Sequence, residues 1–410
     1  MTHPTQIKKS QTQAQIPKGY KWTKLGVIPK EWEESTLGEI GKIRMCKRVF
    51  NHETSEEGDI PFFKIGTFGK SPDAFITNSL FEEYKKKYSF PKKGDILVSA
   101  AGTIGRTVIY NGEPSYFQDS NIVWIDNHEE KVLNVFLFFV YEIVKYDSEG
   151  GTIQRLYNNI ISSARFSLPP LPEQRVIAAC LGTWDRAIEK LDLLIKLKEQ
   201  RKKGLMQQLL TGKKRLPGFS GEWEEKQLGK YFKERSEKGH TDLSLLSIGE
   251  LGVYPQDESN KKDTSNQDKS LYKKICVGDI GYNTMRMWQG RSALSSLEGI
   301  VSPAYTIVAP RANADAKFFS YLFKLQSTIH KFYRNSQGLV RDTRNWKYKD
   351  FAIVKVDLPP TIEEQKAIAT VLTTADKEIK LLQTQLDQLR DQKKGMMQQL
   401  LTGKKRLKID

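Results

Sequence analysis

Arginine, lysine, asparagine and glutamine side chains gather in a few predicted loops of this 410-residue sequence. Arginine can bind the edge of guanine with two hydrogen bonds, asparagine and glutamine can do the same with adenine, and the cations neutralise phosphates. The candidate nucleic-acid contacts in the first half are Arg44, Lys47, Arg48, Thr103, Arg106, Gln154, Arg155, Asn158 and Asn159. Those in the second half are Arg286, Gln289, Gln337, Arg341, Arg344 and Asn345. Each one taken alone could equally be a solvated or structural residue, so the prediction depends on their recurrence in equivalent loops of both halves.

No comparable set of residues predicts catalysis or metal binding. The glycine-containing stretches at 63–71 and 101–107 have two residues between their glycines, where a phosphate-binding P-loop has four. The five histidines form no helical pair and no HExxH motif, and Cys46, Cys180 and Cys276 have no CxxC spacing. The sequence therefore predicts a chain without an active centre, a metal site or a disulfide framework.

The charge balance favours a polyanionic partner. The 65 lysine and arginine residues against 49 aspartates and glutamates give a formal net charge of +16, which suits a nucleic acid, although a generally basic, solvated surface is the alternative. The longest apolar run, 135–141, is too short to cross a bilayer, and residues 1–20 lack the apolar core of a signal peptide. We therefore expect a cytoplasmic protein, in which unpaired cysteines are normal, with a flexible N-terminal tail.

The candidate loops belong to a duplicated unit. The stretch MQQLLTGKKRL occurs at 206–216 and again at 397–407, and the same shift of 191 residues pairs EWEE at 31–34 with EWEE at 222–225. A period that spans nearly half of the chain indicates two similar domains rather than a many-fold solenoid. The predicted boundaries are a flexible tail at 1–20, a first globule at 21–167, a central helix segment at 168–216, a second globule at 217–357 and a distal helix segment at 358–410.

Each globule is predicted to be a mixed domain of the α+β class that presents the candidate loops between strands. The segments 92–110 and 276–294 both contain Gly-Asp-Ile followed by a short strand, a polar loop and a second strand. The apolar segments 135–146 and 318–329 predict one buried helix in each globule. A polar loop then leads into a closing strand before Leu-Pro-Pro in both halves.

The two helix segments carry the strongest periodic signal in the sequence. Apolar residues alternate at spacings of four and three, a 3.5-residue period over about five heptads that is typical of a coiled-coil seam. The predicted seam residues are Ile177, Leu181, Trp184, Ile188, Leu191, Ile195, Ile368, Leu372, Ala375, Ile379, Leu382, Leu386 and Leu389. Lys198, Lys202 and Lys393 interrupt the series, and Lys198 stands where the second helix has Leu389. The alternative is that each helix packs on its own globule, which would favour a broader apolar stripe.

Connectivity dictates how such a pair must run. The first helix leads from the first globule to the second, and the second helix starts at the second globule, so a shared seam makes them antiparallel. Each helix of roughly 38 residues would be about 57 Å long at about 1.5 Å per residue, which exceeds one turn of a DNA duplex at about 34 Å. The chain would then close into a pseudo-twofold ring. In this ring the second MQQLLTGKKRL returns to the first globule, and its Lys-Lys-Arg tip can face phosphate or a partner subunit.

These motifs, in this order, resemble the specificity subunit of type I restriction-modification systems. The resemblance runs from about residue 20 to the end and rests on LPPLPEQRVIA at 168–178, LPPTIEEQKAIA at 358–369, and KKGLMQQLLTGKKRL with KKGMMQQLLTGKKRL. It implies that the globules are target recognition domains, each reading one half of a split sequence in double-stranded DNA. It also implies that the helices are spacers that dock two methyltransferase (M) subunits.

The same resemblance implies that this chain is not an enzyme and holds no cofactor. S-adenosylmethionine would be bound by the M subunits, and ATP and Mg2+ by restriction/translocase (R) subunits. The resemblance identifies no base-reading residues, because recognition domains differ most where they touch DNA. The loop candidates are therefore supported only by the chemistry of their side chains. Two other classes of function stay open here: a bipartite DNA-binding regulator or architectural protein that works alone, and an overlooked metal-dependent nuclease.

Overall fold

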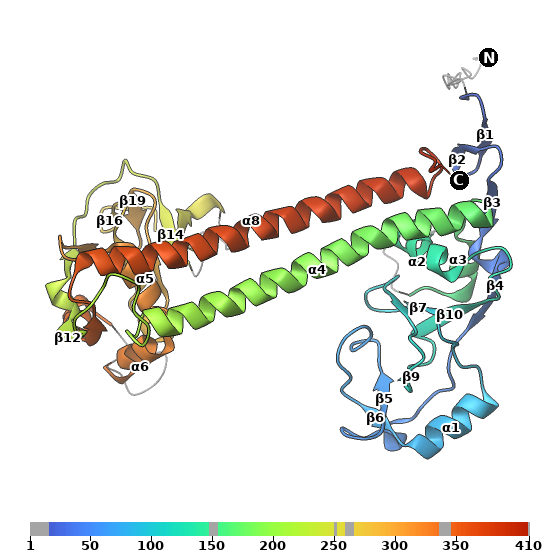
Figure 1. Ribbon diagram of the computed structural model, residues 1–410, viewed down its shortest axis with the longest axis horizontal. Coiled ribbons are helices and arrows are strands. Elements are labelled where there is room, and N and C mark those ends of the chain that lie inside the picture. Colours follow the sequence, from blue (N-terminus) through green and yellow to red (C-terminus); the bar gives the residue numbers. More distant parts are fainter. Residues whose placement is uncertain (1–15, 147–154, 250–251, 259–265, 336–345, 409–410) are drawn as a thin grey trace, which may run out of the picture. The chain divides into compact units, whose positions relative to one another are not determined.

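The structure, a computed structural model, describes residues 16–146, 155–249, 252–258, 266–335 and 346–408 of the chain (Figure 1). It divides into two compact units. Unit 1 comprises residues 1–190 and 386–410, and unit 2 comprises residues 191–385. The last part of the chain therefore belongs to the same unit as the first globule, as the predicted ring closure requires.

Unit 1 is a mixed α/β globule with short strands. The strands are β1 (Tyr20–Thr23), β2 (Gly26–Pro29), β3 (Glu33–Thr36), β4 (Gly41–Arg44), β5 (Ile60–Phe63), β6 (Phe75–Ile76), β7 (Ile96–Ser99), β8 (Thr107–Ile109), β9 (Tyr116–Phe117), β10 (Ile122–Asn127) and β11 (Arg165–Leu168). The helices are α1 (Asn78–Lys87), α2 (Asn134–Ile143), α3 (Asn158–Ser163) and the first part of α4 (Leu171–Leu209). The main sheet has the order β4-β10-β7-β8, and smaller sheets have the orders β6-β5-β9, β1-β2 and β11-β3.

The main sheet of unit 1 is covered on both faces. Val98 and Val123 belong to a hydrophobic cluster with α2, whereas Leu97 and Trp124 belong to a second cluster with α1. Successive strand residues point to opposite faces, so neighbouring residues of β7 and β10 enter different clusters. This two-sided burial explains why these strands read as continuous apolar runs rather than as alternating ones.

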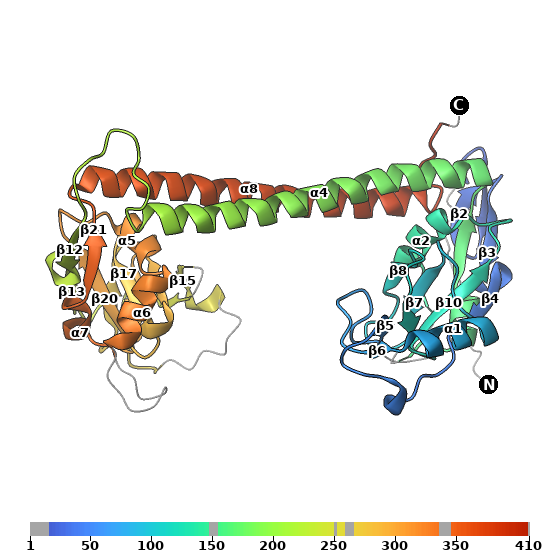
Figure 2. The ribbon, with the colours of Figure 1, turned by 60° about the horizontal axis from the view of Figure 1, so that its bottom comes forward.

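Unit 2 repeats the architecture of unit 1 (Figure 2). Its strands are β12 (Glu224–Gln227), β13 (Phe232–Arg235), β14 (Leu246–Ile248), β15 (Val253–Pro255), β16 (Lys273–Ile275), β17 (Ile280–Asn283), β18 (Ser292–Leu294), β19 (Gly299–Val301), β20 (Tyr305–Pro310) and β21 (Lys355–Leu358). Its helices are α5 (Ala316–Leu322), α6 (Gln326–Arg334), α7 (Tyr348–Ala352) and the first part of α8 (Ile362–Leu400). The main sheet has the order β13-β20-β17-β18, and β12 pairs with β21 as β3 pairs with β11. The two globules are therefore similar α+β domains, as predicted.

One predicted element is different in the structure. The single buried helix predicted over 318–329 was wrong, because this segment contains the end of α5, a turn and the start of α6. Phe319, Leu322, Phe323 and Leu325 are all buried, and their spacing continues a helical apolar pattern through the turn. The apolar pattern alone therefore does not mark where α5 ends and α6 begins. In unit 1, α2 lies within the predicted segment 135–146 except for its first residue.

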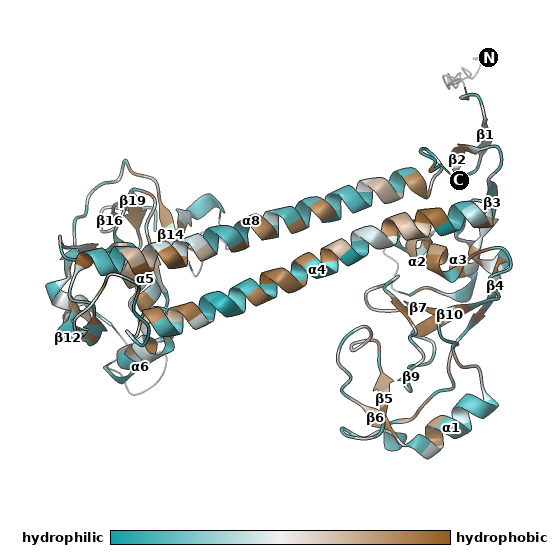
Figure 3. Cartoon of the chain, in the orientation of Figure 1, coloured by the Kyte–Doolittle hydropathy of each residue, from teal (hydrophilic) through white to brown (hydrophobic). Residues whose placement is uncertain are grey.

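The helices α4 and α8 are each 39 residues long; α4 starts directly after its Leu-Pro-Pro segment, and α8 starts one residue further on, after Thr361. All predicted seam residues are buried or half-buried, and both helices alternate between apolar and polar residues along their length (Figure 3). In unit 2, Lys198 of α4 pairs with Glu378 of α8, and Lys202 pairs with Asp376. As the residue number rises along α4, the residue number of its partner on α8 falls. The two helices therefore run antiparallel in unit 2, as predicted.

Candidate nucleic-acid interface

Several candidate loops of unit 1 meet at one edge of the main sheet. In an antiparallel sheet, the ends of β4 and β7 lie at the same edge as the start of β10. There the Ala100 amide donates to the Asn121 carbonyl over 2.7 Å, the Leu156 amide donates to the Ala100 carbonyl over 2.8 Å, and Ala101 bridges to Arg155. A cleft of about 240 Å³ opens at this edge, lined by residues of the β4 loop, the turn before β10 and Arg155.

The three candidate cations at the end of β4 and in the loop that follows it have different surroundings. Arg44 Nε lies 3.4 Å from Asp126 Oδ2, and Lys47 Nζ lies 5.2 Å from the centre of the Tyr88 ring. Arg48 Nε lies 3.0 Å from Asp119 Oδ2, and of the three only Arg48 lines the cleft.

Two further arginines of unit 1 are bound to backbone carbonyls. Arg106 Nη1 donates to the Phe68 carbonyl over 2.9 Å, and Arg155 Nη2 donates to the Ser120 carbonyl over 3.0 Å. Each of these contacts connects two loops, so both arginines stabilise this edge of the main sheet, whether or not they also contact DNA. Thr103 and the α3 residues Asn158 and Asn159 are exposed.

Unit 2 has the corresponding edge after β17. Arg286 and Gln289 are exposed at the 3-10 turn Met287–Gln289. The Trp346 amide donates to the Thr284 carbonyl over 2.7 Å, in the manner of Leu156 and Ala100 in unit 1. Five candidates, Gln154, Gln337, Arg341, Arg344 and Asn345, lie outside the described residues.

A second cleft of about 430 Å³ opens at this edge of unit 2. Its lining includes Glu234, Lys273, Lys347 and Lys349. Burial lowers the pKa of Lys273, and its Nζ donates to the Tyr305 carbonyl over 2.8 Å. The two clefts thus lie at the same edge of their main sheets and are lined by different polar groups.

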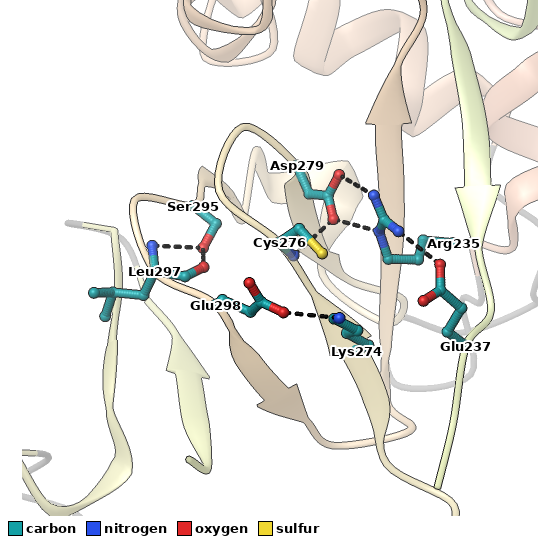
Figure 4. Close-up of polar contacts among 8 residues, drawn as sticks. All are labelled: Arg235, Glu237, Lys274, Cys276, Asp279, Ser295, Leu297 and Glu298. Carbon is teal, nitrogen blue, oxygen red and sulfur yellow. Dashed lines mark hydrogen bonds and ion pairs between the residues drawn. The ribbon is translucent and has the colours of Figure 1, made fainter. Parts of the chain in front are cut away.

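A buried ion pair supports the sheet of unit 2 (Figure 4). Arg235 binds Asp279 through Nε at 2.6 Å and Nη2 at 3.2 Å, and Asp279 also accepts from the Cys276 amide at 2.8 Å. The hydrogen bond to Asp279 raises the pKa of Arg235 above its usual range. In unit 1 the Gly-Asp-Ile aspartate is Asp95, which accepts from the Lys92 amide at 2.7 Å and whose pKa is raised by burial. Among the residues that the structure describes, this turn is therefore stabilised by an arginine in unit 2 and not in unit 1.

A second set of polar contacts joins the distal helix segment to the first globule in unit 1. Glu173 is fully buried and accepts from Trp32 Nε1 at 2.9 Å and from Arg406 at 2.9 and 3.0 Å. Arg406 Nη1 also lies 2.5 Å from Glu31. Gly403 has a φ of 71°, and a Cβ atom there would lie 2.3 Å from Pro29. Glycine is needed at this position both for its backbone angle and for its close approach.

Unit 2 repeats this corner with the other copy of each repeated residue. Arg215 donates to Glu364 through Nε at 2.6 Å and Nη2 at 2.7 Å, and Glu364 is 1% exposed. Gly212 has a φ of 69° and packs against Trp223. The buried Trp223 Nε1, unlike that of Trp32, has no hydrogen-bond partner within the described part of the chain.

These corners correct and extend the sequence interpretation. The Lys-Lys-Arg tip was predicted to be able to face phosphate or a partner subunit; the arginine of each tip binds a buried glutamate, whereas the tip lysines form no ion pair with the residues that the structure describes. The sequence patterns predicted no packing role for the Glu-Gln pairs after Leu-Pro-Pro. Gln174 and Gln365 are buried and bind backbone groups of the preceding globule. The available signal in the sequence was that both the Glu-Gln pair and the distant arginine of the Lys-Lys-Arg tip occur in each half of the chain.

The lysines that interrupt the predicted seam are paired with acids. In unit 1, Lys393 lies 2.7 Å from Asp185 and 3.2 Å from Glu142, above the Phe139 ring. In unit 2, Lys202 binds Asp376 above the Tyr321 ring, whose hydroxyl donates to Asp376 over 2.5 Å. Burial, with this hydrogen bond, raises the pKa of Tyr321 to about 12. Lys393 and Lys202 are repeat equivalents, so each unit has the same ion pair between its helices and an aromatic ring of its globule.

We expect Lys393→Ala to lower the free energy of unfolding of unit 1 by about 1.5–3 kcal/mol, the usual range for hydrogen bonds to charged groups. The lysine side chain is only 11% exposed, and its removal would leave two neighbouring carboxylates without their cation. Urea denaturation would measure the change. The exposed neighbour Lys394→Ala is the matched control, and equal losses in the two variants would show that the ion pair contributes nothing.

The residues that the structure describes contain no group of three or more histidine, cysteine, aspartate or glutamate side chains arranged to hold a metal ion. They also contain no helix that is long and apolar enough to span a membrane.

Comparison with known proteins identifies similar sequences along almost the whole chain. Residues 29–199 and 222–391 each match the family profile of the type I restriction modification DNA specificity domain. The chain is 26% identical over 430 residues to a putative type I restriction enzyme MjaX specificity subunit of Methanocaldococcus jannaschii, covering 95% of this chain and 97% of that protein. A shorter match, 61% identical over 150 residues, covers 36% of this chain and 39% of a putative type I restriction enzyme specificity subunit of Haemophilus influenzae.

Solved structures have the same fold at low sequence identity. The S subunit of a type I restriction-modification system from M. genitalium has a TM-score of 0.53 and 15% identity, with 90% of this chain and 96% of that chain covered. A chain from a study of complex assembly and conformational transition in a type I restriction-modification system has a TM-score of 0.50 and 15% identity, with 92% and 99% covered.

Proposed function

The chain belongs to the family of type I restriction modification DNA specificity domains, and from this premise we propose that its two globules each read one half of a bipartite target in double-stranded DNA. As a specificity chain it is not itself an enzyme. It selects the DNA on which other subunits act, and those subunits supply catalysis.

The observation that carries this proposal is the presence of a cleft at the same sheet edge of each unit. Both clefts are lined by polar and basic side chains, and those side chains differ between the units. A common position suits a common way of approaching DNA, and different lining groups suit different half-sites. The formal charge of +16 supplies the attraction to phosphate that such binding needs.

The helix pair supports a proposal about partners. It carries one equivalent ion pair in each unit, Lys393 with Asp185 and Lys202 with Asp376, so a subunit that recognises this pattern has two equivalent places to bind. We propose that two methyltransferase subunits dock there and that restriction/translocase subunits join this assembly. S-adenosylmethionine would then be bound by the methyltransferase subunits, and ATP and Mg2+ by the restriction/translocase subunits. The exposed Leu193, Leu197 and Leu381 provide apolar surface on the helices for such a contact.

Affinity purification of the tagged full-length chain from its host tests this function. We expect a methyltransferase at about two copies per chain, and a bipartite motif when the complex selects sites from random duplex DNA. Specific binding by the chain alone, without a methyltransferase, would instead support a stand-alone regulator. Absence of any enriched motif would contradict the reading of DNA sequence altogether.

A further inference from the structure

We propose that the cleft of unit 1 binds the major-groove edge of a guanine and that Arg48, oriented by Asp119, reads this base. The inference rests on the proposed DNA-reading function and adds a base and a residue to it. Guanine offers two acceptors, O6 and N7, at the spacing of the arginine fork, which makes arginine the commonest reader of this base.

The contacts of the guanidinium distinguish Arg48 from Arg106 and Arg155. Its side chain is 62% exposed and its Nε is bound to Asp119 at 3.0 Å. Neither of its Nη atoms has a hydrogen-bond partner among the residues that the structure describes. Arg106 and Arg155, by contrast, each use an Nη atom to hold a backbone carbonyl. Arg48 is therefore the cleft arginine with both terminal amino groups available for a ligand.

Asp119 is well placed to orient Arg48. Its side chain is 16% exposed, and Oδ2 also accepts from Ser120 Oγ at 3.0 Å. A carboxylate bound to Nε fixes the plane of the guanidinium and leaves the opposite side of the fork for the base. Fixing the plane reduces the side-chain entropy that is lost when arginine binds.

The backbone of the turn before β10 is held in an unusual conformation. Ser120 has a φ of 60°, in the left-handed region that residues other than glycine rarely adopt. Arg155 holds its carbonyl at 3.0 Å, and the Asn121 amide donates to the Asp119 carbonyl over 2.6 Å. Such conformations persist where surrounding contacts enforce them, and here they set the direction of Asp119.

The remaining wall of the cleft is suited to a base. Phe50 is half exposed and its ring stacks with His52, with centroids 5.8 Å apart and an interplanar angle of 12°. Lys64 also lines the cleft, and its Nζ pairs with the exposed Asp73 at 3.0 Å. The cleft thus combines an arginine whose Nη atoms are available, an exposed aromatic ring and a lysine that can bind phosphate.

The test uses the full-length chain with the methyltransferase that co-purifies with it. The wild-type complex first selects its motif from random duplex DNA, and Arg48→Ala, Arg48→Lys, Asp119→Asn and Lys64→Ala are then compared on that motif and on its single-base variants. We expect Arg48→Ala to lose about 5- to 150-fold in affinity for the motif and to lose preference at one guanine of one half-site. The other half-site and binding to random DNA should be unchanged.

The companion variants separate base reading from other roles. Arg48→Lys should keep charge but lose most of the guanine preference, and Asp119→Asn should weaken preference at the same position by less than Arg48→Ala does. Lys64→Ala should weaken binding equally on all sequences. Equal loss on motif and random DNA for Arg48→Ala would identify a phosphate contact and overturn the assignment, as would an unchanged motif. A wild-type complex that selects no motif would overturn the proposed function itself, which is a distinct result.

Discussion

Replacing Arg406 by alanine is expected to destabilise unit 1 by about 3 kcal/mol, at the lower end of the range for breaking a buried ion pair. Glu173 is fully buried, and without Arg406 its negative charge would keep only the hydrogen bond from Trp32. The lower end applies because the Arg406 side chain is 36% exposed. Thermal and urea denaturation of the full-length variant would measure the loss.

The repeat provides controls for this experiment. Lys405→Ala removes an adjacent exposed cation and should change stability by less than about 0.5 kcal/mol. Adding Glu173→Gln to Arg406→Ala removes the unpaired charge and should restore part of the loss. Arg215→Ala should have the same effect on unit 2 through Glu364. A loss for Arg406→Ala no larger than that for Lys405→Ala would show that Glu173 is hydrated rather than dependent on its ion pair.

A fragment of residues 1–216 is expected to form a homodimer at micromolar concentration. The helix segment that completes unit 1 spans 386–407, and residues 195–216 of a second copy are its repeat equivalents. Arg215 can replace Arg406 against Glu173, and Lys202 can replace Lys393 against Asp185. The fragment therefore carries both sides of the contacts that hold unit 1 together, and two copies can supply them to each other.

Light scattering during size-exclusion chromatography would give the mass of the fragment. The double variant Lys202→Glu with Arg215→Ala should be monomeric. Lys198→Leu should tighten the dimer, because Lys198 stands at the position of the half-buried Leu389, and its acidic partner Glu378 is replaced by Ala187 in the repeat. A wild-type fragment that remains monomeric at this concentration would refute the pseudo-dimer interpretation. If the dimer binds DNA, its selected motif should be symmetric.

The periodic features of the fold could be predicted from sequence because they depend on local patterns. The seam residues follow one rule of spacing, and the Gly-Asp-Ile strands follow another, so α4, α8, β7 and β17 were all foreseen. The antiparallel direction followed from chain order alone. The turn between α5 and α6 was missed because apolar residues such as Phe323 and Leu325 continue the helical pattern through it.

The candidate site was predictable in location but not in the role of each residue. Loops that follow strands of one sheet must meet at its edges, so Arg48 and Arg155 could be expected near each other. That Arg106 and Arg155 hold carbonyls, while the Nη atoms of Arg48 stay available, depends on the distant residues Phe68, Ser120 and Asp119. The role of Glu173 could not be predicted for the same reason, since its partner Arg406 lies 233 positions away.

The two faces of the main sheet in unit 1 belong to two hydrophobic clusters with different roles. One cluster joins the sheet to helix residues such as Ile177, Leu181 and Leu400, and the other contains Phe62 and Val49, which line the cleft. Substitutions that reshape the cleft side are thus shielded by the sheet from the helices. During evolution, the DNA sequence that a globule reads can therefore change while the contacts that join the globule to the helices stay the same.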